Sequence, residues 1–245
     1  MNALSPAELI RMQEGITAAY SIPFIDDIED FVWEAVFAHV RNVTILDPFT
    51  ETRNKKLFDL VDGARRIGWS AKTLSTNVGH GGNFEVVIQR ADIFGKAAEL
   101  GFKPLSTSSK PALLGKALMK HWLDYKVKTD MASQGVTDPR VCVLLKSEDR
   151  QRFTFVEQPL ELMQASDLKW RWTDEKKRGL QGWCGDQLKF RWYRGQTQFF
   201  EIFKVPFNAP VITLQPKRLP LAKVIQILQA ELLNSSALTP IKLGS

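Results

Sequence analysis

The stretch LFDLVDGARRIGWSAKTL, residues 57–74, holds carboxylates and an ammonium group close together in the chain. Asp59 lies in its first half, and Lys72 lies in its second half, inside a segment that otherwise reads as a buried strand. A carboxylate can bind Mg²⁺, which lowers the pKa of bound water and neutralises charge developing on a phosphate. A neighbouring lysine can orient that water and stabilise the transition state. These are residue types that metal-assisted hydrolysis of a phosphodiester bond uses.

A hairpin would bring the two halves of this stretch together. Alternation along a strand places Ser70 and Lys72 on one face of the second strand. On the first strand Asp59 and Asp62 point to opposite faces, so one of them can face Lys72, and the pattern does not decide which. Asp62 precedes Gly63, and Asp-Gly is a hairpin-turn signal. Asp62 is therefore the alternative acid, with a turn role favoured for it.

FDLVD followed by WSAKT resembles the PD-(D/E)xK nuclease signature, as it is found in type II restriction endonucleases. That signature places an Asp on one strand and acid-x-Lys on the next, so Asp59 matches the Asp and Lys72 matches the lysine. The resemblance covers about residues 28–95. It departs at Phe58, which replaces the proline, and at Ser70, which occupies the second acidic position of the catalytic motif without a carboxylate.

The resemblance implies the remaining members of a metal site. Glu34 on a preceding helix, or Glu85 on a later strand, would supply the missing acid, and the Ala71 carbonyl would be a further metal contact. Asp59 would be the main Mg²⁺ ligand and Lys72 the group that positions water. The implied activity is Mg²⁺-dependent, site-specific cutting of double-stranded DNA, which leaves 5′-phosphate and 3′-hydroxyl ends. A homodimer is implied, because cutting both strands of a palindrome most simply needs two sites.

Each of these residues also has a structural alternative. Asp59 could be a strand-end residue paired with Lys56 or Arg66. Glu34 falls off the most apolar stripe of its helix, so a solvated helix face is the alternative to a metal site. Lys72 needs a partner or water in any case, because removing an ammonium group from water is costly.

Positive charge is concentrated beside aromatic residues. The chain has 33 Lys and Arg against 27 Asp and Glu, and KWRW and KFRWYR interleave cations with rings. Such clusters suit a phosphate backbone and exposed bases. The alternative is a sheet whose rings face the core while its cations face water. The residues expected to contact DNA are Arg65, Arg66, His80, Gln89, Arg90, Lys169, Arg171, Lys189, Arg191 and Arg194.

Two other functions compete with the nuclease. One is a non-catalytic DNA- or RNA-binding protein that uses the basic, aromatic sheet. The other is an interaction protein whose positive charge is incidental. His80 lies in the loop NVGHGGN, and the alternative to a DNA contact is that this loop only connects two elements. For Gln89 and Arg90 the alternative is that they simply end a strand.

Hydrophobic periodicity predicts the elements that position these residues. Helices are expected over 5–20, in DDIEDFVWEAVFAHVRN with Asp26 or Asp27 as its cap, in DIFGKAAELGF, in PALLGKALMKHWLDYKVKTDMASQG and in LPLAKVIQILQAELLNSS. Strands are expected over 57–62 and 67–74 and in FEVVIQRADIF, RVCVLLKS, RQRFTFVEQP, LKWRWTD, QLKFRWYRG and TQFFEIFKVPF.

These elements predict a single α/β domain over residues 1–245, with a central mixed β-sheet flanked by helices. By the resemblance its core is like that of restriction endonucleases. The catalytic core is expected over about 26–100, a β-rich region that contacts DNA over about 140–218, and a C-terminal helix over 219–236.

Composition narrows the class of protein. The chain is 44% hydrophobic and 24% charged, which is typical of a globular protein. No apolar run approaches the roughly 20 residues of a membrane span, and the start lacks the apolar core of an export signal. Cys142 and Cys184 lie far apart, as expected of reduced thiols in the cytoplasm. We expect no membrane association and, without a nucleotide fingerprint, no organic cofactor; the resemblance adds a prokaryotic origin.

Overall fold

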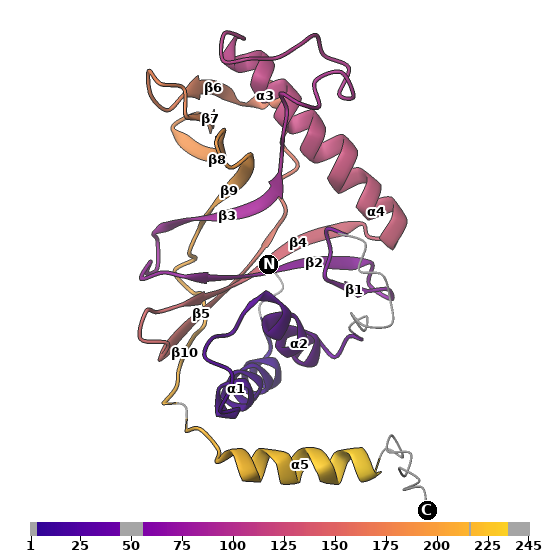
Figure 1. Cartoon of the computed structure of the whole chain (residues 1–245), viewed down its shortest axis with the longest axis vertical. Helices are drawn as coiled ribbons and strands as arrows, with labels where there is room; N and C mark the ends of the chain where they lie inside the picture. Colours follow the sequence, from indigo (N-terminus) through magenta and orange to yellow (C-terminus); the bar gives the residue numbers. More distant parts are fainter. Residues whose placement is uncertain (1–3, 45–55, 216, 235–245) are drawn as a thin grey trace, which may run out of the picture.

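The computed structural model describes residues 4–44, 56–215 and 217–234. These residues form two five-stranded sheets (Figure 1). In spatial order, the strands of sheet A are β1 (Leu60–Asp62), β2 (Ile67–Ser75), β4 (Asp138–Lys146), β5 (Arg152–Pro159) and β10 (Val211–Thr213). Sheet A is mixed, because β2 and β4 run parallel while the other neighbours are antiparallel. The expected hairpin forms between β1 and β2.

Sheet B is antiparallel throughout. In spatial order, its strands are β3 (Asn83–Arg90), β9 (Gln198–Lys204), β8 (Gln187–Tyr193), β7 (Gly179–Cys184) and β6 (Lys169–Trp172). The mixed α/β class is confirmed, but the single central sheet is wrong, since the strands divide between two sheets. Period-2 alternation identifies a strand and its buried face, and it says nothing of which strands pair.

The first helix, α1 (Pro6–Ser21), begins as expected. The Glu8 backbone N–H donates to Ser5 Oγ at 3.2 Å, and the Ser5 N–H donates to the Glu8 carboxylate at 2.8 Å. This reciprocal pair satisfies two of the donors that a helix start leaves unpaired. A proline at the first position adds to the signal, because its missing N–H costs nothing there.

The second helix, α2 (Asp30–Arg41), begins later than expected. Glu29 occupies its N-cap, so the prediction of Asp26 or Asp27 as the cap is wrong. Asp27 instead accepts a hydrogen bond from the buried Lys146 ammonium at 2.9 Å. A buried lysine needs such a partner, and this requirement takes the carboxylate away from the helix start.

Both helices pack on one face of sheet A through aromatic rings. The Phe37 and Trp69 ring centroids lie 5.8 Å apart, and Trp33 Nε1 donates to the Cys142 carbonyl at 3.4 Å. At the end of α2, Arg41 forms ion pairs with Glu8 and with Glu157, whose other oxygen accepts from Trp69. These contacts fix α2 alongside β2.

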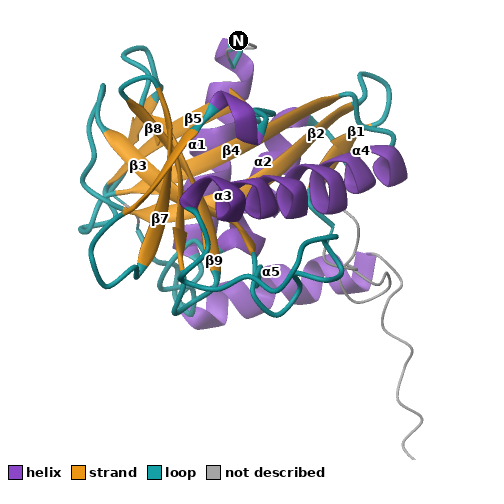
Figure 2. Cartoon of the chain, turned by 90° about the horizontal axis from the view of Figure 1, so that it is seen from above, coloured by secondary structure: helices purple, strands orange, loops and turns teal. Residues whose placement is uncertain are grey.

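A long helical rod follows, made of α3 (Pro111–Met119), the π-helical η1 (Lys120–Val127) and α4 (Lys128–Gln134) (Figure 2). Its apolar side packs against the inner face of sheet B, with Leu114 and Leu118 in one cluster with Trp170 and Trp192. A short 3₁₀ turn, η2 (Ala165–Asp167), precedes β6. The helix expected in DIFGKAAELGF is wrong: residues 93–101 form turns, since a segment this short with a central glycine nucleates a helix poorly.

A further cluster joins the two sheets into one domain. Its buried residues are Phe84, Val86, Phe203, Val205 and Ala209 beside Val141, Val143, Leu145 and Val156 of sheet A. The last helix, α5 (Leu221–Asn234), extends away from this body (Figure 1). The sheet-to-sheet contact brings the end of β5 close to β9: the Gln158 side chain donates to the Lys204 carbonyl at 2.8 Å.

Candidate functional site

Asp59 and Lys72 meet at the edge of β2, where β1 begins. The Asp59 backbone N–H donates to the Trp69 carbonyl at 2.9 Å, which extends the β1–β2 pairing by one bond. The next N–H of β2 bonds to the Asp59 side chain: Asp59 Oδ2 accepts from the Ala71 N–H at 2.8 Å. The same oxygen lies 3.4 Å from Lys72 Nζ. Asp59 therefore satisfies a strand-edge N–H and pairs with the ammonium at the same time.

The Lys72 ammonium is held between two oxygens. In addition to its contact with Asp59, Nζ donates to the Ala71 carbonyl at 2.8 Å. A carboxylate oxygen and a carbonyl oxygen thus converge on a single cation. The side chains of Lys72 and Asp59 are 27% and 19% exposed, so water and a ligand can reach them.

Two acids of α2 run along the same edge. Asp30 Oδ1 accepts from the Thr73 N–H at 2.7 Å and from its hydroxyl at 2.9 Å. Glu34 follows one turn later on the same side of the helix and is buried, with 5% of its surface exposed. Because Asp30 contacts Thr73 and Phe37 contacts Trp69, Glu34 lies on the part of α2 that passes Ala71.

The other acids named from the sequence lie elsewhere. Glu85 belongs to β3 of sheet B and forms an ion pair with Arg191, so the expectation of Glu85 at this site is wrong. Asp62 holds the hairpin turn, where it accepts from the Arg65 N–H at 2.9 Å. Ser70 is buried at 5% exposure on β2 and offers a hydroxyl where the motif has an acid.

A buried thiol lies behind the site. Cys142 is the register partner of Ala71 on β4. Burial raises the pKa of the Cys142 thiol well above its usual value, and the charges of Glu157 and Asp59 add to this. The thiol is therefore neutral, and Cys142 acts as a small apolar residue behind the edge.

Of the residues expected to contact DNA, several have structural partners. His80 Nε2 lies 3.1 Å from the Ala209 carbonyl, and Gln89 Nε2 lies 2.5 Å from His121 Nδ1. Burial lowers the pKa of His121, which keeps its ring neutral beside Gln89. Exposed residues at the β1–β2 turn and the end of β3 are Arg65, Arg66 and Arg90.

One face of sheet B carries a continuous row of cross-strand partners. From β6 to β3 these are Arg171, Gln181, Arg191, Phe200 and Val87. The adjacent row, made of Trp170, Gly182, Phe190, Glu201 and Val86, is buried on the opposite face. Cations and a ring thus share the face turned away from the core, while most of the tryptophans fill the core.

Rings and guanidinium groups contact one another on this face. The Arg171 guanidinium lies 4.0 Å from the centroid of the Trp183 ring. Arg191 donates to the Tyr193 hydroxyl at 3.0 Å, and the Tyr193 ring meets Phe200 edge-on at 5.3 Å. Such pairs of cation and ring offer both a charge and a flat stacking surface.

The remaining cations of the region differ in their surroundings. Lys169 is exposed on β6, and Arg194 lies in the turn after β8. Lys189 is instead held 2.9 Å from Glu161, so its charge is already balanced. Lys169 and Arg171 are therefore the most available cations of this face.

Comparison with protein-family models, with curated proteins and with solved structures finds no significant match. Within the described ranges, no helix is long and apolar enough to cross a membrane.

Sequence reasoning missed two residues of interest. Asp30 supports the edge beside the site; its position four residues before Glu34 was the available signal, since both then share a helix face. Glu201 is fully buried on β9, and nothing in its local pattern, FFEIF, distinguishes it from an acid on a solvent-facing position.

The site can be tested for fit to Mg²⁺. Among the residues that the structure describes, no group of three or more His, Cys, Asp or Glu side chains gathers as a metal site. Mg²⁺, however, usually takes one or two carboxylates and completes its shell with water and phosphate oxygens. The Asp59 carboxylate and the Ala71 carbonyl would supply two oxygens of such a shell, and in this structure both contact the Lys72 ammonium. Glu34 lies on the adjacent helix.

Proposed function

We propose that the protein is a Mg²⁺-dependent endonuclease that hydrolyses phosphodiester bonds of double-stranded DNA, in the manner of the type II restriction enzymes that its motif resembles. The observation that carries this proposal is the Lys72 ammonium, held between the Asp59 carboxylate and the Ala71 carbonyl. Oxygens that converge on one cation at a solvent-accessible strand edge are what a metal-assisted hydrolysis requires.

Each residue has a role in this proposal. Asp59 and the Ala71 carbonyl hold the metal, and Glu34 supplies the second carboxylate that Ser70 cannot. When bound, Mg²⁺ acidifies a water molecule and neutralises charge on the phosphate. Lys72 keeps its positive charge beside the reacting phosphate and orients the attacking water.

DNA is bound by the cationic face of sheet B. Lys169 and Arg171 contact the phosphate backbone, and the Arg171–Trp183 pair offers a ring beside the charge. A homodimer supplies the two sites needed to cut both strands.

The proposal is tested by incubating the purified protein with plasmid and phage DNA, with and without Mg²⁺. Discrete fragments that need the metal support it. Lys72→Ala is expected to reduce cutting at least about 100-fold while DNA affinity changes less than about tenfold, or about 1.4 kcal/mol.

The matched control is Lys128→Ala on α4, which removes another lysine paired with a carboxylate, Asp124, at 2.6 Å. Its cutting rate should equal that of the wild type. Equal cutting by Lys72→Ala and the wild type would contradict the assignment.

A second function is favoured by the row of sheet B. A protein that binds DNA or RNA without cutting it needs only that cationic, aromatic face, and the Asp59–Lys72 pair then serves as a structural ion pair. In that case the same experiment gives retarded but intact nucleic acid, with or without Mg²⁺.

A further inference from the structure

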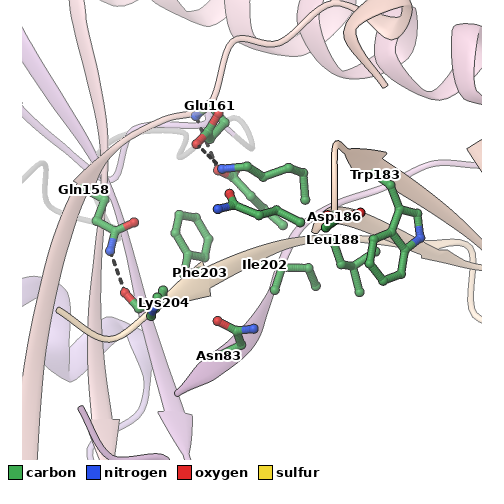
Figure 3. A pocket seen from close by; sticks show the side chains of 12 residues that line it. Asn83, Gln158, Glu161, Trp183, Asp186, Leu188, Ile202, Phe203 and Lys204 are labelled. Atoms are coloured by element: carbon green, nitrogen blue, oxygen red, sulfur yellow. Dashed lines mark hydrogen bonds and ion pairs between the residues drawn. The ribbon is translucent and has the colours of Figure 1, made fainter. Parts of the chain in front are cut away.

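A cavity of about 520 Å³ lies where sheet B meets the end of β5 (Figure 3). This volume falls in the range of about 300–1,000 Å³ that is usual for small-molecule sites. Its lining includes apolar side chains, Leu188, Ile202 and Phe203, and the amides of Asn83 and Gln187. It belongs to sheet B, whereas Asp59 and Lys72 lie on the edge of sheet A.

In one buried acid of the lining, one of the two carboxyl oxygens has no hydrogen-bond partner among the described residues. Glu201 is fully buried, and Oε1 accepts only a long bond, 3.4 Å, from the Glu161 N–H. Oε2 has no partner within the described part of the chain. Burial raises the pKa of the Glu201 carboxyl well above its usual range, and the charge of Glu161 adds to this, so burial favours the protonated form, which donates a hydrogen bond. A buried donor without an acceptor is unfavourable, and a ligand that offers one would relieve it.

The charges around the cavity balance. Lys189 lies 2.9 Å from Glu161, and Lys204 and Asp186 also line the cavity. Two cations thus face two carboxylates, and the raised pKa of Glu201 opposes a further negative charge. The surroundings favour a ligand without net charge in the part that enters.

A flat ring forms one wall. Trp183 lines the cavity, and the Arg171 guanidinium lies 4.0 Å from the centroid of its ring. Trp183 therefore adds apolar aromatic surface to the lining. Because Arg171 also belongs to the cationic row of sheet B, the cavity adjoins the face on which we place nucleic acid.

We propose that this cavity binds a nucleobase, which accepts a hydrogen bond from Glu201 through a ring nitrogen or carbonyl. A nucleobase is planar, uncharged and rich in acceptors, and the amides of Asn83 and Gln187 can pair with its edge. The base belongs either to a free nucleotide or to a strand from which it is turned out. This site does not depend on the cutting reaction.

Isothermal titration calorimetry without Mg²⁺ tests the proposal, so that the result is independent of cutting. The wild-type protein is titrated with the nucleoside monophosphates and with a short single-stranded oligonucleotide, each to millimolar concentration. Saturable binding of a nucleotide indicates a free ligand. Binding of the oligonucleotide alone indicates a base within a strand.

Three variants identify the site. Glu201→Leu and Trp183→Leu are expected to weaken binding at least tenfold, and Glu201→Gln, which keeps an N–H donor, less than threefold. Glu175→Leu, in the exposed turn before β7, is the matched control and should bind like the wild type. Thermal melts establish that each variant is folded.

Two results would overturn the proposal. One is the absence of saturable binding for every nucleotide and for the oligonucleotide. The other is a Glu201→Leu variant that folds and binds as tightly as the wild type.

Discussion

The Asp59 carboxylate makes a structural hydrogen bond and also belongs to the proposed metal site. It accepts a hydrogen bond from the Ala71 N–H at the edge of β2, and it contacts the Lys72 ammonium. Removing the whole side chain therefore changes both stability and the proposed cutting, because an unpaired strand-edge N–H is destabilising in its own right. A substitution that keeps the acceptor but removes the charge separates them.

Asp59→Asn is expected to fold with a free energy of unfolding within about 1 kcal/mol of the wild type, since the amide oxygen still accepts from Ala71. Its cutting rate should fall at least about 100-fold, because the amide is a poor Mg²⁺ ligand. Asp59→Ala should also lose about 1–3 kcal/mol of stability. Chemical denaturation and plasmid cleavage measure the two effects.

The control for Asp59→Asn is Asp62→Asn, which changes an acid of the hairpin turn. It should cut at the wild-type rate. If Asp59→Asn cuts like the wild type, Asp59 is not a ligand of the proposed metal.

Glu201 gives a prediction about pH. Below about pH 4.5, the usual pKa of the group, its carboxyl is protonated in both the folded and the unfolded chain. As the pH rises above this value, the unfolded chain releases the proton while the folded chain holds it, because burial raises the folded pKa. The free energy of unfolding of the wild type therefore falls with rising pH on account of this group.

Glu201→Leu removes this dependence together with the unpaired oxygen. We expect it to be more stable than the wild type by about 1–3 kcal/mol at neutral pH, with a smaller difference at about pH 4. Urea denaturation at a series of pH values measures the difference. A variant less stable than the wild type at neutral pH would mean that the carboxyl is satisfied in the folded protein.

At this scale the sequence predicts some contacts and not others. A contact between Lys72 and an acid of the first strand follows from the hairpin, because a short turn brings neighbouring strands together. The pattern leaves Asp59 and Asp62 both open for that contact, and the structure shows that it is Asp59. The sequence does not predict that Glu34, and not Glu85, lies near this edge. That outcome depends on how α2 crosses β2 and on the assignment of β3 to the other sheet.

The elements themselves follow from local patterns to different degrees. The capping box of α1 and the apolar stripe of α2 are local signals, and both helices form. β7, with the sequence GLQGWC, was not predicted, because two glycines interrupt its alternation. Gly182 is required there by its neighbour: a Cβ at this position would lie 2.9 Å from the Trp170 ring.

Packing of α3 on β6 depends on a glycine in the helix. A Cβ on Gly115 would lie 2.2–2.4 Å from three ring atoms of Trp170, so the helix and strand could not keep their present approach. Gly115→Ala is expected to lose about 1–3 kcal/mol of stability, despite the better helix propensity of alanine. Thermal or urea unfolding measures the loss.

Gly63→Ala is the matched control for this substitution, because a Cβ there meets nothing within 4 Å among the described atoms. It should change the free energy of unfolding by less than about 0.5 kcal/mol. A stable Gly115→Ala would indicate that Trp170 can move and that α3 is not tightly held.

For the whole molecule, composition and element order predict the mixed α/β class but not the division into two sheets. Each amphipathic strand has one apolar face, and either sheet could bury it. The division has a functional consequence. It separates the Asp59–Lys72 edge of sheet A from the cationic row of sheet B, so the proposed cutting and the proposed nucleic-acid binding can be tested independently.

The charge of the molecule gives the last prediction. If the protein binds DNA through its cations, as we propose, its affinity should fall as salt rises. If Lys169 and Arg171 each contact one phosphate, replacing both by glutamine should reduce the slope of log affinity against log salt by about 2. At 0.1 M salt each loss should weaken binding about eightfold, equally for every sequence. Lys128→Gln on α4 is the control. Fluorescence anisotropy at several salt concentrations measures the slope for each protein. An unchanged slope in the double variant would mean that DNA binds to another face.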